Sequence, residues 1–170
     1  DFVTLAGSAQ WLLVAAKVGV SSDGRNLIKL VNVNSSSIGV DVKVLPSLPF
    51  IPDVSHGVVT FDAVVVDSEN IYQGDGYSDF VKPFRWFEDL NVLTSISGYL
   101  FKLAYTYKWP TEAQADIMSI LVTLGSLRCT QAGEPVGHVV LFNQANRLKG
   151  WLERYNKGWE CTPISIADAW

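Results

Sequence analysis

The chain has 170 residues, of which 48% are hydrophobic and 18% are charged, and its formal net charge is −4. This length fits a single domain, and a composition rich in aromatic residues and poor in charge excludes a disordered chain or a coiled coil. The negative charge argues against a general nucleic-acid binder. The longest apolar run, 11–20, is too short to span a membrane, which takes a helix of about 20 residues.

Alternation of apolar and polar residues predicts strands in the N-terminal half. The apolar runs 11–20 and 27–33 flank an Asp-Gly pair at Asp23, and such a pair between apolar runs predicts a β-hairpin. Residues 38–44 alternate strictly, which predicts a half-buried strand. Residues 58–66 form a β-branched run and predict a buried strand.

The C-terminal half begins with the clearest alternation of all. The odd positions of 99–109 are aromatic or leucine, which predicts a strand with one aromatic face turned inward. Apolar residues at helical spacing predict an amphipathic helix at about 111–124. Thr111 and Gln114 are spaced as a capping box at its start, and Gly125 is placed to end it.

Two further β segments are predicted beyond this helix. Residues 136–142 are expected to form a buried strand, and 149–155 and 159–166 a final hairpin. The predicted fold is therefore mainly β, a β-sandwich or partly open antiparallel barrel with one amphipathic helix. We expect one domain over 1–170, with long loops at about 46–57 and 67–87.

Catalytic motifs are absent from the sequence. It contains no nucleophile elbow, metalloprotease motif, P-loop or dinucleotide-binding glycine loop. His56 lies beside Ser55 and near Asp53 in one loop, but the members of a catalytic triad normally come from separate elements. His138 is expected in a strand, partly buried or at an interface. We therefore expect no catalytic residue, no cofactor and no enzyme activity.

Metal and disulfide sites are also considered. The acidic side chains of the second loop are interpreted either as a solvated loop or as a calcium site, although their spacing fits no EF-hand; they are Asp67, Glu69, Asp75 and Asp79. Cys129 and Cys161 are either two small buried residues or one disulfide. Zinc is excluded because no Cys-x-x-Cys pair or His/Cys cluster occurs. No metal site is predicted.

Aromatic residues exceed what a core of this size needs. Trp109 is expected in the core because it ends the aromatic face. Trp86 lies between Phe84 and Phe87 after a polar loop, a pattern that fits insertion into a neighbouring subunit, burial in the core or stacking on a sugar. The candidate interface residues are Phe84, Trp86, Phe87, Trp151 and Trp159.

The chain from Tyr99 onward resembles the tail-tube and distal-tail (Dit-like) structural proteins of tailed bacteriophages. The similar features are an alternating strand that ends at Trp109, a short helix opened by Thr111 and Glu112, and a Trp-centred alternation over 158–166. The resemblance implies a β-sandwich-plus-helix protomer that assembles into rings of six or three.

A second resemblance is to the jelly roll of the C1q/tumour-necrosis-factor family. It is carried by residues 61–64, by scattered aromatic, glycine and proline positions from Tyr72 to Pro83, and by 98–101. The spacing slips by one residue and the closing motif of that family is missing. This resemblance implies a trimeric recognition head.

The function expected from the sequence is that of a non-enzymatic structural subunit of a virion, such as a phage tail tube, distal tail or connector-like ring. Its partners would be copies of itself and neighbouring virion proteins, without specific nucleic-acid binding, and it would be assembled in the host cytoplasm. The alternative is a secreted β-sandwich or jelly-roll module that binds a carbohydrate or a receptor. That alternative predicts a concave patch with Trp86 or Trp151 beside Asn143 and Gln144.

Overall fold

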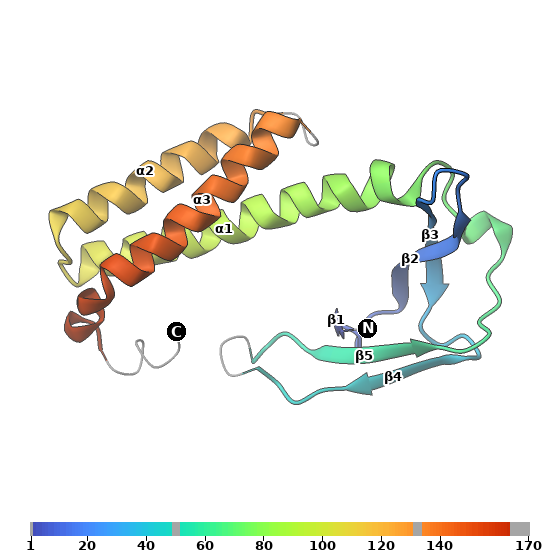
Figure 1. Ribbon diagram of the computed structural model, residues 1–170. Helices are drawn as coiled ribbons and strands as arrows, with labels where there is room; N and C mark the ends of the chain where they lie inside the picture. The colour runs from blue at the N-terminus through green and yellow to red at the C-terminus, as the bar shows by residue number, and fades with distance from the viewer. Residues whose placement is uncertain (1, 49–51, 131–133, 164–170) are drawn as a thin grey trace. The chain divides into compact units, whose positions relative to one another are not determined.

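The computed structural model describes residues 2–48, 52–130 and 134–163. The chain divides into two compact units, residues 1–81 and 82–170. Within the described residues, the first unit contains five strands and the second contains three long helices (Figure 1). The expectation of a single domain stays a prediction, because a division into compact units does not by itself show that either part folds alone.

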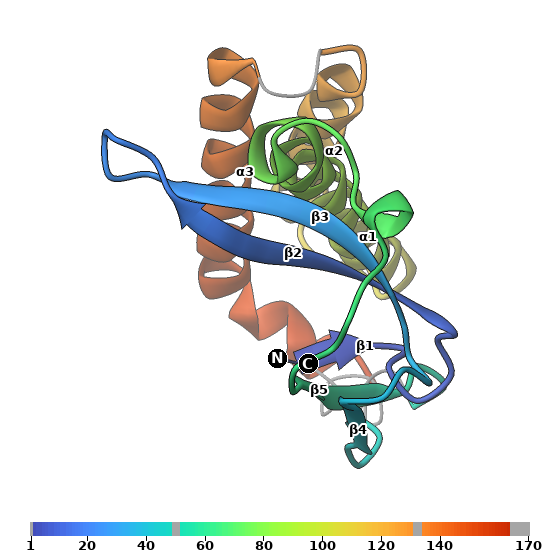
Figure 2. The same ribbon diagram turned by 90° about the vertical axis from the view of Figure 1, so that its right-hand side faces the viewer.

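Strands β2 (Trp11–Val20) and β3 (Asn26–Asn34) form the long antiparallel hairpin that the sequence predicted (Figure 2). Their pairing is regular except for a shift of register between Lys17 and Gly19. At the turn, Gly24 has a φ of +82°. Residues other than glycine rarely adopt this backbone conformation, so the Asp-Gly pair is the local cause of the turn.

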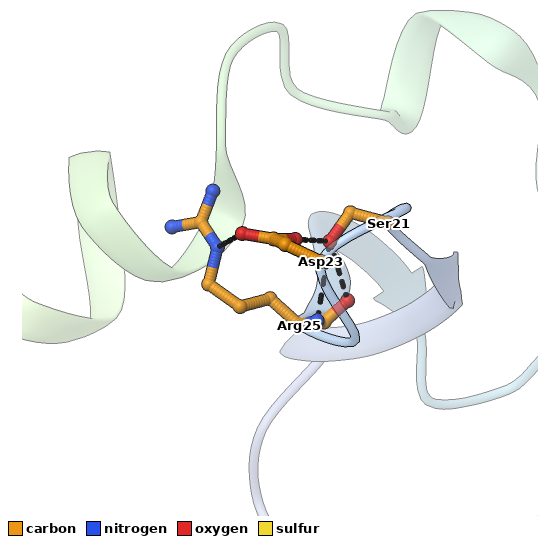
Figure 3. A network of polar contacts seen from close by, with 3 residues as sticks. All are labelled: Ser21, Asp23 and Arg25. Carbon is orange, nitrogen blue, oxygen red and sulfur yellow. Dashed lines mark hydrogen bonds and ion pairs between the residues drawn. The ribbon is translucent and has the colours of Figure 1, made fainter.

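Polar side chains stabilise this turn (Figure 3). Arg25 Nε donates a hydrogen bond to Asp23 Oδ2 at 3.1 Å, and the Ser21 hydroxyl donates to Asp23 Oδ1. The backbone N–H of Arg25 donates in turn to Ser21 Oγ at 3.2 Å. Donation from the Ser21 hydroxyl, helped by Arg25, holds the pKa of Asp23 below its ordinary value.

A second sheet has the strand order β1-β5-β4, all antiparallel. It consists of β1 (Phe2–Thr4), β4 (Val40–Val44) and β5 (His56–Phe61). β4 confirms the strand predicted over 38–44. β5 begins two residues before the strand predicted over 58–66 and ends at Phe61, so it also takes up the end of the loop expected over 46–57; residues 49–51 of that loop lie outside the described residues.

The second expected loop, 67–87, is wrong in large part. It contains a short 3-10 helix (Ser68–Asn70), a π-helical turn (Gly76–Val81) and the start of helix α1. A Cβ on Gly76 would lie 2.8 Å from the backbone carbonyl carbon of Lys29. The π-helical turn therefore presses directly on strand β3, and only glycine allows this approach.

The sheet unit has a small apolar core. The clustered buried residues are Ala6, Leu12, Val33 and Val59. Because strand side chains alternate between two faces, the other face of β2 leaves large apolar side chains exposed. These are Trp11 and Leu13; beyond the shift of register, Val18 and Val20 are exposed as well.

The second unit consists of helices α1 (Lys82–Thr106), α2 (Thr111–Leu127) and α3 (Pro135–Arg154), followed by a 3-10 helix at Asn156–Cys161. All three long helices contact one another. The mainly β fold predicted from the sequence is therefore wrong, because about half of the described residues are helical and only about a fifth lie in strands.

The predicted strand 99–109 lies in helix α1 and the turn after it. The alternating aromatic positions do not share a face, since Tyr99 and Tyr105 are exposed whereas Leu103 is buried. The side chains that α1 buries are spaced by three, four or seven residues, as on one face of a helix. They are Trp86, Leu90, Ser97, Leu100, Leu103 and Ala104.

The one predicted helix is confirmed as α2, but its ends differ from the prediction. Pro110 precedes the first helical residue, so Thr111 is not the cap, and no side chain caps the helix. Gln114 Nε2 donates instead to the carbonyl of Trp109 at 2.9 Å. The helix continues through Gly125 to Leu127.

Helix α3 replaces both the strand predicted over 136–142 and the first strand of the final hairpin. The second strand of that hairpin is also wrong, since residues up to Cys161 form the 3-10 helix; residues 164–166 lie outside the described residues. The residues that α3 buries follow intervals of four, three, four and three, which is a helical stripe. They are Gly137, Leu141, Gln144, Leu148 and Trp151.

Three tryptophans pack together in the helical unit. The Trp109 ring stacks on Trp151 with centroids 5.4 Å apart and meets Trp159 edge-on at 5.2 Å. Trp109 Nε1 donates to Thr162 Oγ1, and Trp151 Nε1 donates to the carbonyl of Ala113. The core position predicted for Trp109 is confirmed, since its side chain is buried.

Candidate functional site

An apolar groove runs between α1 and α3, and we call it the α1/α3 groove. Its volume is about 460 Å³, and it is lined by Asp89, Val92, Leu93, His138, Leu141, Phe142 and Ala145. Two of these side chains are largely exposed, Val92 at 50% and Phe142 at 66%. The groove therefore offers apolar surface to solvent, with one carboxylate on its wall.

The end of this groove is built around the contact between His138 and Trp86. The imidazole meets the indole edge-on with ring centroids 5.0 Å apart. A Cβ on the preceding Gly137 would lie 2.8 Å from Trp86 Cη2, so glycine allows α3 to approach the indole closely. His138 Nε2 and Trp86 Nε1 are buried without a hydrogen-bond partner among the described residues. Such groups cost about 1–3 kcal/mol each.

Charged side chains on the exposed part of helix α1 pair with one another. Arg85 lies 3.9 Å from the Asp89 carboxylate and 4.0 Å from that of Glu88, in exposed pairs. Arg128, from the end of α2, donates to the amide oxygen of Asn91 at 3.3 Å. These exposed contacts contribute little to stability, but they leave Asp89 balanced by a cation.

The carboxylates of the described residues are exposed, with one exception. Asp116 on α2 is half-buried; its Oδ2 accepts a hydrogen bond from the Tyr155 hydroxyl at 2.8 Å and faces Arg154 Nη1 at 3.3 Å. Donation to Asp116 raises the pKa of Tyr155. The described residues contain no group of His, Cys, Asp and Glu able to hold a metal ion. The acidic side chains of 67–79 are exposed.

The predicted interface residues fall into two groups. Phe84 and Phe87 are exposed on α1, at 62% and 54%. Trp86 and Trp151 are buried inside the helical unit, and Trp159 is half-buried against Trp109. An interface role stays a prediction, and only the two phenylalanines present most of their surface for it.

Of the remaining predicted residues, His138 lines the α1/α3 groove, whereas His56, Cys129 and Cys161 do not. Cys129 and Cys161 are exposed with free thiols, so the expected burial is not found, and a disulfide between them stays a prediction. His56 is buried at the start of β5. His138 is half-buried, as expected, but on a helix. Of the α3 residues that line the groove, only His138 was singled out from the sequence; Leu141, Phe142 and Ala145 carried no motif.

No family model and no curated protein matches the chain. Among solved structures, it is similar to butyryl-CoA dehydrogenase from Megasphaera elsdenii, with 14% identity and a TM-score of 0.69 over 96% of this chain and 49% of that one. A probable acyl-CoA dehydrogenase from Mycobacterium abscessus matches with 14% identity and a TM-score of 0.71, over 96% and 49%.

A dibenzothiophene monooxygenase from Paenibacillus sp. A11-2 is similar at 16% identity with a TM-score of 0.58, over 98% of this chain and 54% of that one. The chain thus has the fold of a part of these proteins and spans about half of their length. At these identities the likeness shows the fold alone.

This likeness corrects several expectations. The resemblance to phage tail proteins is wrong. The expectations that depended on it are therefore wrong too: a structural subunit of a virion, a ring assembled with virion proteins, and a location in the virion. The jelly-roll alternative fails because the fold is not a β-sandwich. The fold is one that enzymes use, so the expectation of a non-enzyme family is also wrong. None of the described helices is long and apolar enough to cross a membrane, as predicted.

Proposed function

We propose that the chain is the sheet-plus-helix part of an acyl-CoA-dehydrogenase-like subunit and that it binds a coenzyme A thioester. The supporting observation is the match of 96% of the chain, strands and helices together, to about half of butyryl-CoA dehydrogenase. A fold can host several chemistries. The thioester is nevertheless the substrate class that recurs among these neighbours, since glutaryl-coenzyme A dehydrogenase also matches, at 14% identity.

The chemistry of such an enzyme needs more than the described residues offer. Dehydrogenation of an acyl chain would remove one hydrogen as a proton and the next as a hydride, and a hydride-accepting cofactor would supply the second part of that chemistry. The proton needs a general base with a tuned pKa in a site kept from water. The described carboxylates are exposed apart from Asp116, which Tyr155 and Arg154 already engage. They do not fit this base, so the role proposed for the described residues is binding.

Calorimetric titration of the 170-residue chain with butyryl-CoA tests the proposal. Free coenzyme A and butyrate serve as matched controls, because each carries only part of the thioester. We expect butyryl-CoA to bind more tightly than either part and to raise the melting temperature. A ligand present at a hundred times its dissociation constant stabilises a protein by about 2.7 kcal/mol. Equal or absent binding of all three compounds contradicts the proposal.

We also propose that the chain associates with a second copy through α3. Val136, Val139 and Phe142 are exposed on this helix, at 72%, 61% and 66%. They recur every three residues, which places them close together along one side of a helix. Large exposed apolar patches mark association sites.

Native mass measured across a concentration range tests this association. We expect a dimer or larger assembly for the natural chain and a shift towards monomer for Phe142→Asp. The control is Val122→Asp on α2, where the side chain is equally exposed, at 62%. A monomer at every concentration, or an equal effect of both variants, contradicts the role given to α3.

A further inference from the structure

A second groove lies between α2 and α3, and we call it the α2/α3 groove. Its volume is about 620 Å³, and its walls include Asp116, Ile120, Asn143, Gln144, Arg147 and Trp151. Volumes of roughly 300–1,000 Å³ are typical of sites for small molecules. Its wall is more polar than that of the α1/α3 groove, which suggests a ligand with hydrogen-bonding groups.

Arg147 is held in position on this wall by neutral groups. Its Nη1 donates to Gln144 Oε1 at 3.1 Å, and its Nη2 donates to Ser119 Oγ at 3.3 Å. Gln144 is only 6% exposed, so the group that orients the guanidinium is itself fixed by packing. Among the ion pairs of the described residues, none includes Arg147.

The other charged groups of the groove neutralise each other. Asp116 Oδ2 lies 3.3 Å from Arg154 Nη1 and also accepts from the Tyr155 hydroxyl. The guanidinium of Arg154 lies 5.9 Å from the centre of the Tyr155 ring. One positive charge, that of Arg147, therefore remains uncompensated on the wall.

The groups around Arg147 match an anion with oxygen acceptors. A guanidinium has five N–H donors in a rigid fork, and the two bonds to Gln144 and Ser119 leave donors for a ligand. The exposed carboxamides of Asn143 and Asn146 line the same groove and can donate further hydrogen bonds. Apolar contact is available from Ile120 and Trp151.

We propose that the α2/α3 groove binds a small molecule through an oxyanion, either a phosphate or a carboxylate, and that Arg147 makes the main contact with this anion. Both anions fit the guanidinium fork. The proposal does not rest on the thioester function, since it uses only contacts within α2 and α3.

Titration of the whole chain with inorganic phosphate and, separately, with acetate tests the proposal at constant ionic strength. We expect Arg147→Gln to weaken binding at least tenfold, or by about 1.4 kcal/mol, because the variant loses the charge-assisted hydrogen bonds of the guanidinium to the anion. Arg147→Lys keeps the positive charge but loses the guanidinium fork, so its affinity for the anion should lie between those of the natural chain and Arg147→Gln. The matched control is Arg128→Gln, which removes an exposed arginine outside the groove and should leave binding unchanged.

The outcomes separate the possible ligands and decide the proposal. Tighter binding of phosphate points to a phosphate ester, and tighter binding of acetate points to a carboxylic acid; either supports the site. Binding of neither anion overturns it, as does an equal loss in Arg147→Gln and Arg128→Gln. A circular dichroism spectrum of each variant establishes that Arg147→Gln is folded; if it is not, the milder Arg147→Lys decides by the same comparison.

Discussion

The two units of the chain bury apolar side chains to very different extents. Within the described residues, thirteen buried side chains form one cluster in the helical unit, against four in the sheet unit. The helical unit fills its core with large rings, including Trp109 and Trp151. The sheet unit instead leaves one face of β2 exposed, with Trp11 and Leu13 among its side chains. Because apolar burial is the main source of stability, we expect the helical unit to be the more stable of the two.

The largest effect is expected from Trp109→Ala. Removing a buried indole costs about 3–5 kcal/mol, and here it also breaks the stack with Trp151 and the bond to Thr162. Hydrogen exchange should show faster opening of the α1, α2 and α3 amides. Trp11→Ala is the control, since Trp11 is 47% exposed. Equal protection of the helices in both variants would contradict the role given to the tryptophan cluster.

Two leucine substitutions compare the units directly. Leu124→Ala in α2 and Leu12→Ala in β2 remove the same atoms, and each should cost about 2–5 kcal/mol. Leu124 is fully buried whereas Leu12 retains 5% exposure beside a thin core. We expect the larger loss for Leu124, because its surroundings have less freedom to close the cavity. Urea unfolding followed by amide exchange measures both, and a larger loss for Leu12 would reverse the proposed order of stability.

A smaller effect is expected from Gly137→Ala. The new methyl group would lie 2.8 Å from the buried Trp86 ring, and overpacking of this kind costs about 1–3 kcal/mol. Gly125→Ala is the matched control on α2, where nothing lies within 4 Å of the new Cβ; it should stabilise by about 0.5–1 kcal/mol. The two melting temperatures should therefore move in opposite directions, and a common direction would show that α3 tolerates the methyl group.

The smallest effect concerns acid pH and the sheet unit. Donation from the Ser78 backbone N–H lowers the pKa of Asp75, and donation from the Ser21 hydroxyl lowers that of Asp23, both from an ordinary 3.8. Because the folded pKa values are depressed, their stabilisation is present above pH 3.8 and is lost as the pH falls through the folded values. The double variant Asp23→Asn/Asp75→Asn should show a flatter pH dependence of the sheet unit's melting temperature; an unchanged slope would contradict this.

The sequence predicted the elements whose signal is local. The hairpin around Gly24 follows from an Asp-Gly turn between apolar runs, and α2 follows from apolar residues at helical spacing. Helix α3 could not be recognised in this way. Its buried stripe includes Gly137 and Gln144, which are not apolar, whereas Val136 and Val139 are exposed and give the segment a β-branched appearance.

The candidate sites were harder to predict than the fold. Trp86 stands out in the sequence, but its burial depends on the approach of Gly137, which lies in a helix where the sequence predicts a strand. Arg147 gave no signal, because a single arginine on a polar helix face is normally solvated. Its position becomes informative only when α2 brings Ser119 and Asp116 beside α3.

The clustering of indoles in one unit also has an optical consequence. Trp86, Trp109, Trp151 and Trp159 belong to the helical unit, and the only tryptophan of residues 1–81 is the half-exposed Trp11. Indole emission depends on contact with water and with neighbouring rings, so it changes most where the stacked rings separate. Tryptophan fluorescence would therefore follow the unfolding of the helices, while the sheet could melt with little change in the signal.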